Sequence, residues 1–214
     1  MNVGDIRRRI KAKVGDTAGT EVTDGQLLDW INDGQLEIAR RTQQPQATAT
    51  TATVVAQGSY SITAFSADVL RLRSVMHDGV LLQALSQEEA DTQLPDRERN
   101  PQPGTPQQFW VWADQIHLWP RPQTAGLALK IFYVKRPAAV AVDADVPGIP
   151  LHMHTDLLAY VWSQVLETIG DNDRAGREMD RFAGSSASAA ADAEWPTRAT
   201  YPHVTISADD MSWG

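Results

Sequence analysis

The chain contains no cysteine, and this absence removes several classes of function at once. Without cysteine there is no disulfide framework, no thiolate zinc site and no cysteine nucleophile. The chain also lacks any apolar run close to the roughly 18 residues that a membrane span needs. Its first residues, Met1–Asp5, lack the apolar core of a signal peptide. We therefore expect a protein that is made and folded in the cytoplasm and has no membrane partner.

Positive charge is scarce as well. The chain carries 19 Lys and Arg against 27 Asp and Glu, a formal net charge of −8. Such a protein is a poor candidate for a broad electrostatic grip on nucleic acid. One basic stretch, Arg7–Lys13, stands out. We interpret it as the solvated face of an amphipathic helix or as a protein contact rather than as a DNA site.

The motifs of common catalytic sites are missing too. No serine lies in a Gly-x-Ser-x-Gly elbow, and no glycine-rich loop precedes a lysine or forms a dinucleotide fingerprint. Acidic residues are numerous enough for a glycosidase pair, but their spacing singles out no two of them. At 214 residues the chain buries about 70% of its unfolded surface and needs no metal for stability. We expect neither an enzyme nor a bound cofactor.

The best metal candidate is a short run that contains His152, His154 and Asp156. On a strand these side chains would share one face and would suit zinc or iron. On a helix, residues two apart point away from each other, and this run opens a predicted helix. We therefore favour a helix entry with an acidic first turn and keep a metal-dependent hydrolase as a minor alternative.

Both ends of the chain are predicted to be helical. Apolar residues recur at three- and four-residue spacing over residues 3–14, which Gly15 ends. The run Thr23–Gln26 matches a capping box and begins a second helix that ends near Thr42. A third helix begins at Leu151, and a short fourth follows the break at residues 170–172.

The middle of the chain changes to the two-residue period of strands. The predicted strands cover residues 48–55, 60–62, 69–77, 80–83, 109–112, 116–119 and 127–135. Asp78-Gly79 is a predicted hairpin turn, and the capping box that begins at Ser86 predicts a short helix to about Leu94. Residues 127–135 are apolar on both faces, which predicts a central, covered strand.

This order predicts an α+β fold. Helices from the N- and C-terminal parts form one bundle around a β-rich middle insertion, a small sheet or barrel, and an extended C-terminal tail follows. We place the N-terminal helices in residues 1–47, the β-rich subdomain in 48–136, the C-terminal helices in 137–184 and the extended arm in 185–214.

The most distinctive segment is the hairpin between Gly104 and Pro122, which proline residues bound on both sides. Alternation places Trp110 and Trp112 on one face and Phe109 with Val111 on the other. One face is expected in the core, and the other needs a cover. The tryptophans could stack on sugar rings, which gives a carbohydrate-binding or tail-associated recognition module as the alternative function. A neighbouring subunit is the commoner cover.

The last part of the chain has a different composition. Residues 185–191 are low-complexity Ser and Ala and are not expected to order by themselves in water. The aromatic and β-branched residues beyond them form the predicted partner interface, namely Trp195, Tyr201, Val204, Ile206 and Trp213, together with Trp110 and Trp112 of the hairpin. Docking of this tail on its own domain stays an alternative.

The order of these elements resembles tailed-bacteriophage head-to-tail adaptor proteins, also called connector or head-completion proteins. The resemblance covers residues 3–183 and rests on the order of the predicted elements and on the residues that separate them. Its motifs are the helix 3–14, Leu27–Asn32, the strand that ends at Tyr60, Leu70–Asp78, Gly104–Pro106, Ile116–Pro122, Ile149-Pro150 and Leu157–Tyr160.

The resemblance implies a structural protein of the virion, located at the portal vertex of the head-tail junction. Such proteins form a ring, typically of twelve subunits, that binds the portal protein and a downstream nozzle, tail terminator or tail tube. Double-stranded DNA passes through the ring without specific binding, and an extended arm commonly reaches into the portal. An acidic channel lining would let DNA slide, because attraction to phosphate would act as a brake.

Overall fold

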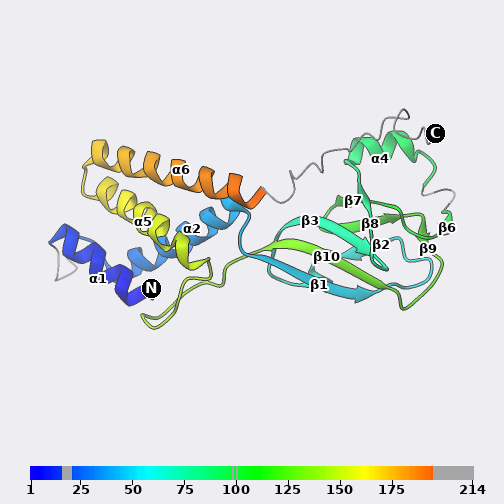
Figure 1. Ribbon diagram of the computed structural model, residues 1–214, viewed down its shortest axis with the longest axis horizontal. Helices are drawn as coiled ribbons and strands as arrows, with labels where there is room; N and C mark the ends of the chain where they lie inside the picture. The colour runs from blue at the N-terminus through cyan, green and yellow to red at the C-terminus, as the bar shows by residue number, and fades with distance from the viewer. Residues whose placement is uncertain (16–20, 98, 100, 195–214) are drawn as a thin grey trace, which may run out of the picture.

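The computed structural model describes residues 1–15, 21–97, 99 and 101–194. The molecule is elongated, with a helical domain at one end and a β domain at the other (Figure 1). Within the described residues, two connections join the domains, residues 43–45 and residues 136–150. The predicted α+β fold, with the two ends of the chain packed together around a β-rich middle, is confirmed.

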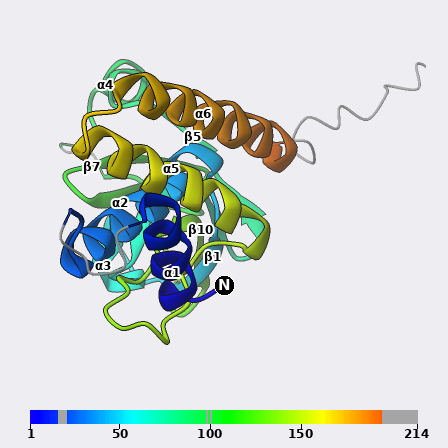
Figure 2. The same ribbon diagram turned by 90° about the vertical axis from the view of Figure 1, so that its left-hand side faces the viewer.

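The helical domain consists of α1 (Val3–Val14), α2 (Asp24–Thr42), α5 (His154–Thr168) and α6 (Asn172–Glu194), with a 3₁₀ turn η1 (Leu151–Met153) before α5. Figure 2, which faces this end of the molecule, shows α5 and α6 running side by side. Its core includes the buried residues Val3, Ile6, Ile10, Leu27, Ile31, Ile38, Leu157, Val161, Val165, Leu166 and Phe182.

The predicted ends of the first two helices are confirmed. Asn2 and Asp5 form a capping box on α1, and Gly15 ends that helix with a φ of 77°. The capping box of Thr23 and Gln26 begins α2. These contacts satisfy backbone groups that the first and last turns would otherwise leave unpaired.

Helices α2 and α5 approach closely at Gly34. A Cβ atom at this position would lie 2.6 Å from Leu157 Cδ1 and 2.7 Å from Tyr160 Cδ1. We expect Gly34→Ala to lower the free energy of unfolding by about 1–3 kcal/mol, because the added methyl group pushes the helices apart. Gly25→Ala is the matched control on the same helix, since its nearest atom, Thr23 Oγ1, lies at 4.0 Å.

Denaturant unfolding of both variants tests this packing. The Gly25→Ala control should raise the free energy of unfolding by up to about 1 kcal/mol, because alanine is the better helix former at an open position. If Gly34→Ala raised the free energy of unfolding as much as the control does, the space between α2 and α5 would be large enough for the added methyl group.

The β domain is a sandwich of two four-stranded sheets, β1-β10-β3-β4 and β2-β8-β7-β5, with a two-stranded sheet β6-β9 beside them. The strands are β1 (Gln46–Ala52), β2 (Ser59–Ser61), β3 (Val69–His77), β4 (Val80–Leu81), β5 (Gln83–Ala84), β6 (Pro103–Gly104), β7 (Gln108–Trp112), β8 (Gln115–Trp119), β9 (Arg121–Pro122) and β10 (Ala128–Lys135). Two short helices, α3 (Ile62–Phe65) and α4 (Gln87–Gln93), complete it. The core between the sheets includes Tyr60, Val75, Phe109, Ile116, Leu118, Leu129, Ile131 and Tyr133.

Both predicted hairpins are present. Asp78 and Gly79 have φ angles of 48° and 81°, and Ala113 and Asp114 have 49° and 58°. Two consecutive positive φ angles are typical of the tight turns that match the twist of paired strands. The strand β10 lies between β1 and β3, as predicted, although on its second face Lys130 and Phe132 are only half-buried and Ala128 is exposed.

Some predicted strands have other bounds. The expected strand 80–83 is split, because β4 pairs in one sheet and β5 in the other, with buried Leu82 at the crossing. The first strand occupies 46–52 rather than 48–55. Ile62 begins α3 rather than ending a strand, since its N–H bonds to Asp114 O at the tip of the β7–β8 hairpin.

The predicted end of the last helix near Gly184 is wrong. Helix α6 continues through the Ser/Ala run to Glu194, so residues 185–191 are helical rather than part of an extended arm. Tertiary contacts supply the reason: Ser186 is buried, Ala189 packs against the helical core, and Ser185 Oγ donates to Asp156 Oδ1 at 2.6 Å. Alanine is a strong helix former once a neighbouring surface is available.

Candidate assembly surface

The connection that returns the chain from β10 to the helical domain is fixed by two amide side chains of α2. Asn32 Nδ2 donates to Val140 O at 3.1 Å, and Val140 N donates to Asn32 Oδ1 at 2.8 Å. Gln35 Nε2 donates to Ala138 O at 2.8 Å, and Gly148 N donates to Gln35 Oε1 at 3.1 Å. The two amides also bond to each other at 3.0 Å. We call this set of contacts the amide clamp.

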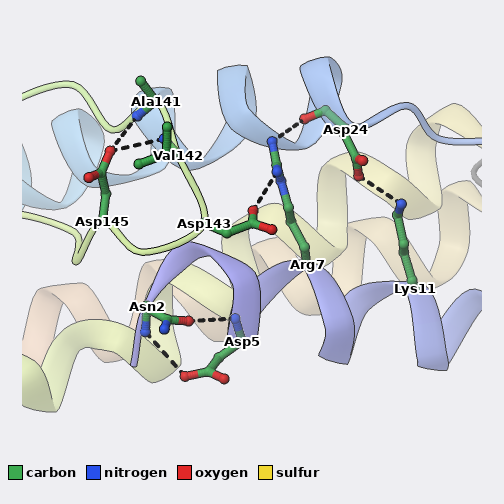
Figure 3. Close-up of polar contacts among 9 residues, drawn as sticks. All are labelled: Asn2, Asp5, Arg7, Lys11, Asp24, Ala141, Val142, Asp143 and Asp145. Carbon is green, nitrogen blue, oxygen red and sulfur yellow. Dashed lines mark hydrogen bonds and ion pairs between the residues drawn. The ribbon is translucent and has the colours of Figure 1, made fainter.

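The start of α1 holds the same connection from its other side (Figure 3). Val3 N donates to Asp145 O at 2.9 Å, and Gly4 N donates to Asp143 O at 3.0 Å. The Asp145 carboxylate in turn accepts the N–H groups of Ala141 (2.7 Å) and Val142 (3.0 Å). These backbone donors lower the pKa of Asp145. The contribution of this turn to folding is therefore complete above the ordinary carboxyl pKa of about 4 and is lost as the pH falls through the lowered value.

Three of the five basic residues of α1, namely Arg7, Lys11 and Lys13, contact other parts of the chain, while Arg8 and Arg9 are exposed. Arg7 donates to Asp143 Oδ1 at 2.5 Å and to Asp24 O at 2.9 Å, and Lys11 pairs with Asp24 at 2.7 Å (Figure 3). The hydrogen bond from Lys11 lowers the pKa of Asp24. Lys13 Nζ lies 5.1 Å from the centre of the Trp162 ring. These contacts tie α1 to α2 and to the 136–150 connection, so Arg7 and Lys11 are not available to a phosphate backbone.

The held connection presents apolar side chains to solvent. Val142 is 57% exposed and Val146 is 61% exposed, and Leu151 directly after the connection is 72% exposed. We call these three residues the valine–leucine surface. Ordinary surface loops are polar and mobile, whereas this one combines a backbone fixed by many hydrogen bonds with exposed apolar groups. Exposed apolar side chains on an ordered backbone are typical of a protein–protein contact.

The predicted metal residues are separated by the helix entry. His152 lies in η1, while His154 is 4% exposed at the start of α5 with its Nε2 3.3 Å from Ile149 O. Burial lowers the pKa of His154 below its ordinary value, because desolvation disfavours the charged ring. Asp156 accepts a hydrogen bond from Ser185. Among the described residues, no three His, Asp or Glu side chains come together as a possible metal site.

The two tryptophans of the hairpin differ in exposure. Trp110 is 6% exposed and packs with Leu85 and Ala90, the latter in α4, while Trp112 is 60% exposed at the end of β7. The Trp110 ring stacks on His117 with centroids 5.1 Å apart, and the guanidinium of Arg97 lies 5.2 Å from its centre. The cover that alternation required for Trp110 thus comes from its own chain.

Trp110 borders a cavity of about 400 Å³, but one ring face is stacked on His117 and Arg97 lies against the ring. These contacts leave little of the ring as a platform for a sugar. The other predicted interface residues, Trp195, Tyr201, Val204, Ile206 and Trp213, lie outside the described residues.

Sequence reasoning did not identify the amide clamp or the valine–leucine surface. One signal was present: Gln35 follows Ile31 by four residues and precedes Ile38 by three, so a polar amide occupies a position of the buried stripe. A buried amide at such a position needs hydrogen-bond partners. Those partners come from residues more than 100 positions away, which local spacing does not reveal.

The family model described as SU10 adaptor protein matches residues 1–204, which includes both domains and extends beyond the segment that carried the resemblance. No curated protein matches the chain. Within the described residues, none of the helices combines the length and the hydropathy required to cross a membrane.

Proposed function

We propose, because the chain belongs to the SU10 adaptor protein family of phage head-to-tail adaptors, that its copies assemble into a ring that joins the portal to the tail. This is a family of structural adaptors and not of enzymes, so its members act by binding other virion proteins. The observation that carries the proposal is the match over residues 1–204, since it spans both the helical and the β domain.

The valine–leucine surface is our candidate for the contact between neighbouring copies in this ring. Val142 and Val146 are exposed on a backbone that is already ordered, so their burial costs little conformational entropy. Trp112 is a second candidate contact, because aromatic residues are enriched in the centres of interfaces. For the aromatic residues of 195–214 we propose contacts with the portal or a sister subunit.

We further propose twelve copies in the ring, a central channel for double-stranded DNA and a downstream partner from the tail. The net charge of −8 supports a channel that DNA crosses without binding, because an acidic wall repels phosphate. The ion pairs of Arg7 and Lys11 support the same conclusion, since they neutralise cations on α1.

Co-expression of this chain with the portal protein of the same virus tests the proposal. We expect the two proteins to sediment together, and electron microscopy of the complex to show an added ring of this chain on the portal. The chain without the portal serves as the control for assembly by itself. A chain that folds normally but never joins a portal ring would contradict the proposed function.

A further inference from the structure

We propose that the free edge of β1 accepts residues 203–208 of a neighbouring copy as an added β-strand. This inference rests on the proposed ring, and it assigns to one surface of the β domain a partner segment from the same chain. The added strand would extend the β1-β10-β3-β4 sheet beyond β1 and join adjacent subunits through backbone hydrogen bonds.

The free edge belongs to the longest outer strand of the two sheets. β1 has seven residues, and among the strands that the structure describes it pairs with β10 alone, in one continuous antiparallel register. The opposite edge strand β4 has two residues, and the edges of the other sheet, β2 and β5, have three and two. Figure 1 shows β1 along the lower margin of the β domain. It is therefore the edge with room for a partner strand.

The hydrogen bonds of β1 show which backbone groups point outward. Lys135 N donates to Pro45 O at 2.8 Å, Thr53 N donates to Leu127 O at 2.9 Å, and Gly126 N donates to Thr53 O at 2.8 Å. The backbone N–H and C=O groups of the odd-numbered residues of β1 therefore point toward β10, because these groups alternate sides along an antiparallel strand. The N–H and C=O groups of Gln46, Thr48, Thr50 and Ala52 face the open edge.

None of the usual protections of an edge strand is present on β1. Proteins block such edges with charged residues, proline, bulges or very short strands. The sequence Gln46–Ala52 is Gln-Ala-Thr-Ala-Thr-Thr-Ala, which has no charge and no proline, and its register with β10 has no bulge. An unprotected edge of this length is a predicted site of strand pairing.

The two faces of β1 specify what an added strand should look like. On its inner face, Ala47 and Ala49 are small and lie at the margin of the sandwich core beside the partly buried Ile62 and Phe65. On its outer face, Thr48 and Thr50 are exposed. A matching strand therefore alternates larger apolar residues, which complete the core margin, with polar residues that face solvent.

Residues 203–208 have this pattern. Their sequence is His-Val-Thr-Ile-Ser-Ala, whose alternation would place Val204 and Ile206 on one face of an added strand and Thr205 and Ser207 on the other. Pro202 precedes the segment and Asp209-Asp210 follow it, which bounds a strand close to the length of β1. Eight residues separate it from the end of α6 at Glu194, a reach of up to roughly 26–29 Å when extended.

A neighbouring copy is the donor that suits a ring. In an arm-to-edge contact each copy uses two different surfaces, one to give a strand and one to receive it. Heterologous contacts form a ring when the rotation between copies closes, whereas pairing of β1 with a second β1 would be isologous and would stop at a dimer. The proposed head-to-tail ring therefore favours exchange of residues 203–208 between subunits.

Thiol cross-linking tests this exchange cleanly, because the chain has no cysteine of its own. Two tagged forms, one with Thr50→Cys and one with Thr205→Cys, are co-expressed with the portal protein and treated with a short bismaleimide. We expect a cross-linked dimer that carries both tags. Thr92→Cys, an exposed position on α4, replaces Thr50→Cys in the control and should give no such dimer.

A second experiment blocks the open edge of β1 at residue 50, and the cross-linking cysteine is therefore placed at Thr48 instead. Thr50→Pro removes an N–H that faces the open edge and leaves the β1–β10 ladder intact. It should reduce the cross-link between Thr48→Cys and Thr205→Cys about tenfold. Thr50→Val keeps the N–H and should cross-link like the parent chain, and thermal melts verify that each variant folds.

The outcomes separate the two proposals. A ring on the portal without the mixed dimer, a cross-link confined to single chains, or a cross-link of the arm to the portal alone would overturn the strand exchange while leaving the adaptor function intact. Absence of any ring with the unmodified chain would contradict the proposed function itself and would remove the premise of the exchange.

Discussion

Chains that carry Val142→Lys together with Val146→Lys are expected to fold like the wild type but to stay out of the ring. Both side chains are more than half exposed, so little packing within the subunit is lost. Lysine suits the local charge, because Asp143 and Asp145 lie in the same segment. In an interface, however, burying the two ammonium groups costs several kcal/mol, because Asp143 is already paired with Arg7 and the Asp145 carboxylate already accepts two backbone N–H groups. Assembly on the portal should fall by about 100-fold or more.

Sedimentation with the portal measures this loss, and the melting temperature of the isolated chain verifies the fold. Val54→Lys with Val55→Lys is the matched control, since these valines are 51% and 54% exposed but lie in the β domain. We expect the control to assemble. Normal assembly of the Val142 and Val146 variant would show that the valine–leucine surface is not the contact between copies.

Local patterns predicted those parts of the fold that local chemistry determines. Capping boxes begin at Thr23 and Ser86, and paired turn residues fix the two hairpins. What local patterns missed depends on distant contacts. Residues 185–191 are helical because α6 packs along the helical bundle. Residues 80–83 divide between two sheets because Leu82, between β4 and β5, is buried in the core of the β domain. Neither neighbour is visible in a short window of sequence.

The candidate surface was harder to predict than the fold. Val142 and Val146 look like ordinary residues of a proline-rich connection, and only the fixed backbone around them makes their exposure informative. The aromatic composition of the hairpin indicates a binding surface, yet Trp110 packs within its own chain. Composition identifies groups that are able to bind, but burial decides which of them face a partner.

The amide clamp leads to the second large expected effect. Gln35→Leu keeps the volume of the side chain but leaves Ala138 O and Gly148 N without their partner at a site where Gln35 is 2% exposed. Each buried polar group left unpaired costs about 1–3 kcal/mol. We expect the free energy of unfolding to fall by about 2–4 kcal/mol, and the melting temperature by about 5–12 °C. Ring assembly should fall as well, because the clamp orders the connection that carries Val142 and Val146.

Thermal and denaturant unfolding measure the loss, with Gln93→Leu as the same exchange at an exposed position of α4 and an expected change within about 0.5 kcal/mol. Asn32→Leu supplies a sharper comparison. Because Asn32 and Gln35 bond to each other and hold neighbouring parts of one backbone segment, the double variant should lose less than the sum of the single losses. Additive losses would mean that the two amides act separately. A Gln35→Leu variant as stable as the control would show that the connection does not depend on the clamp.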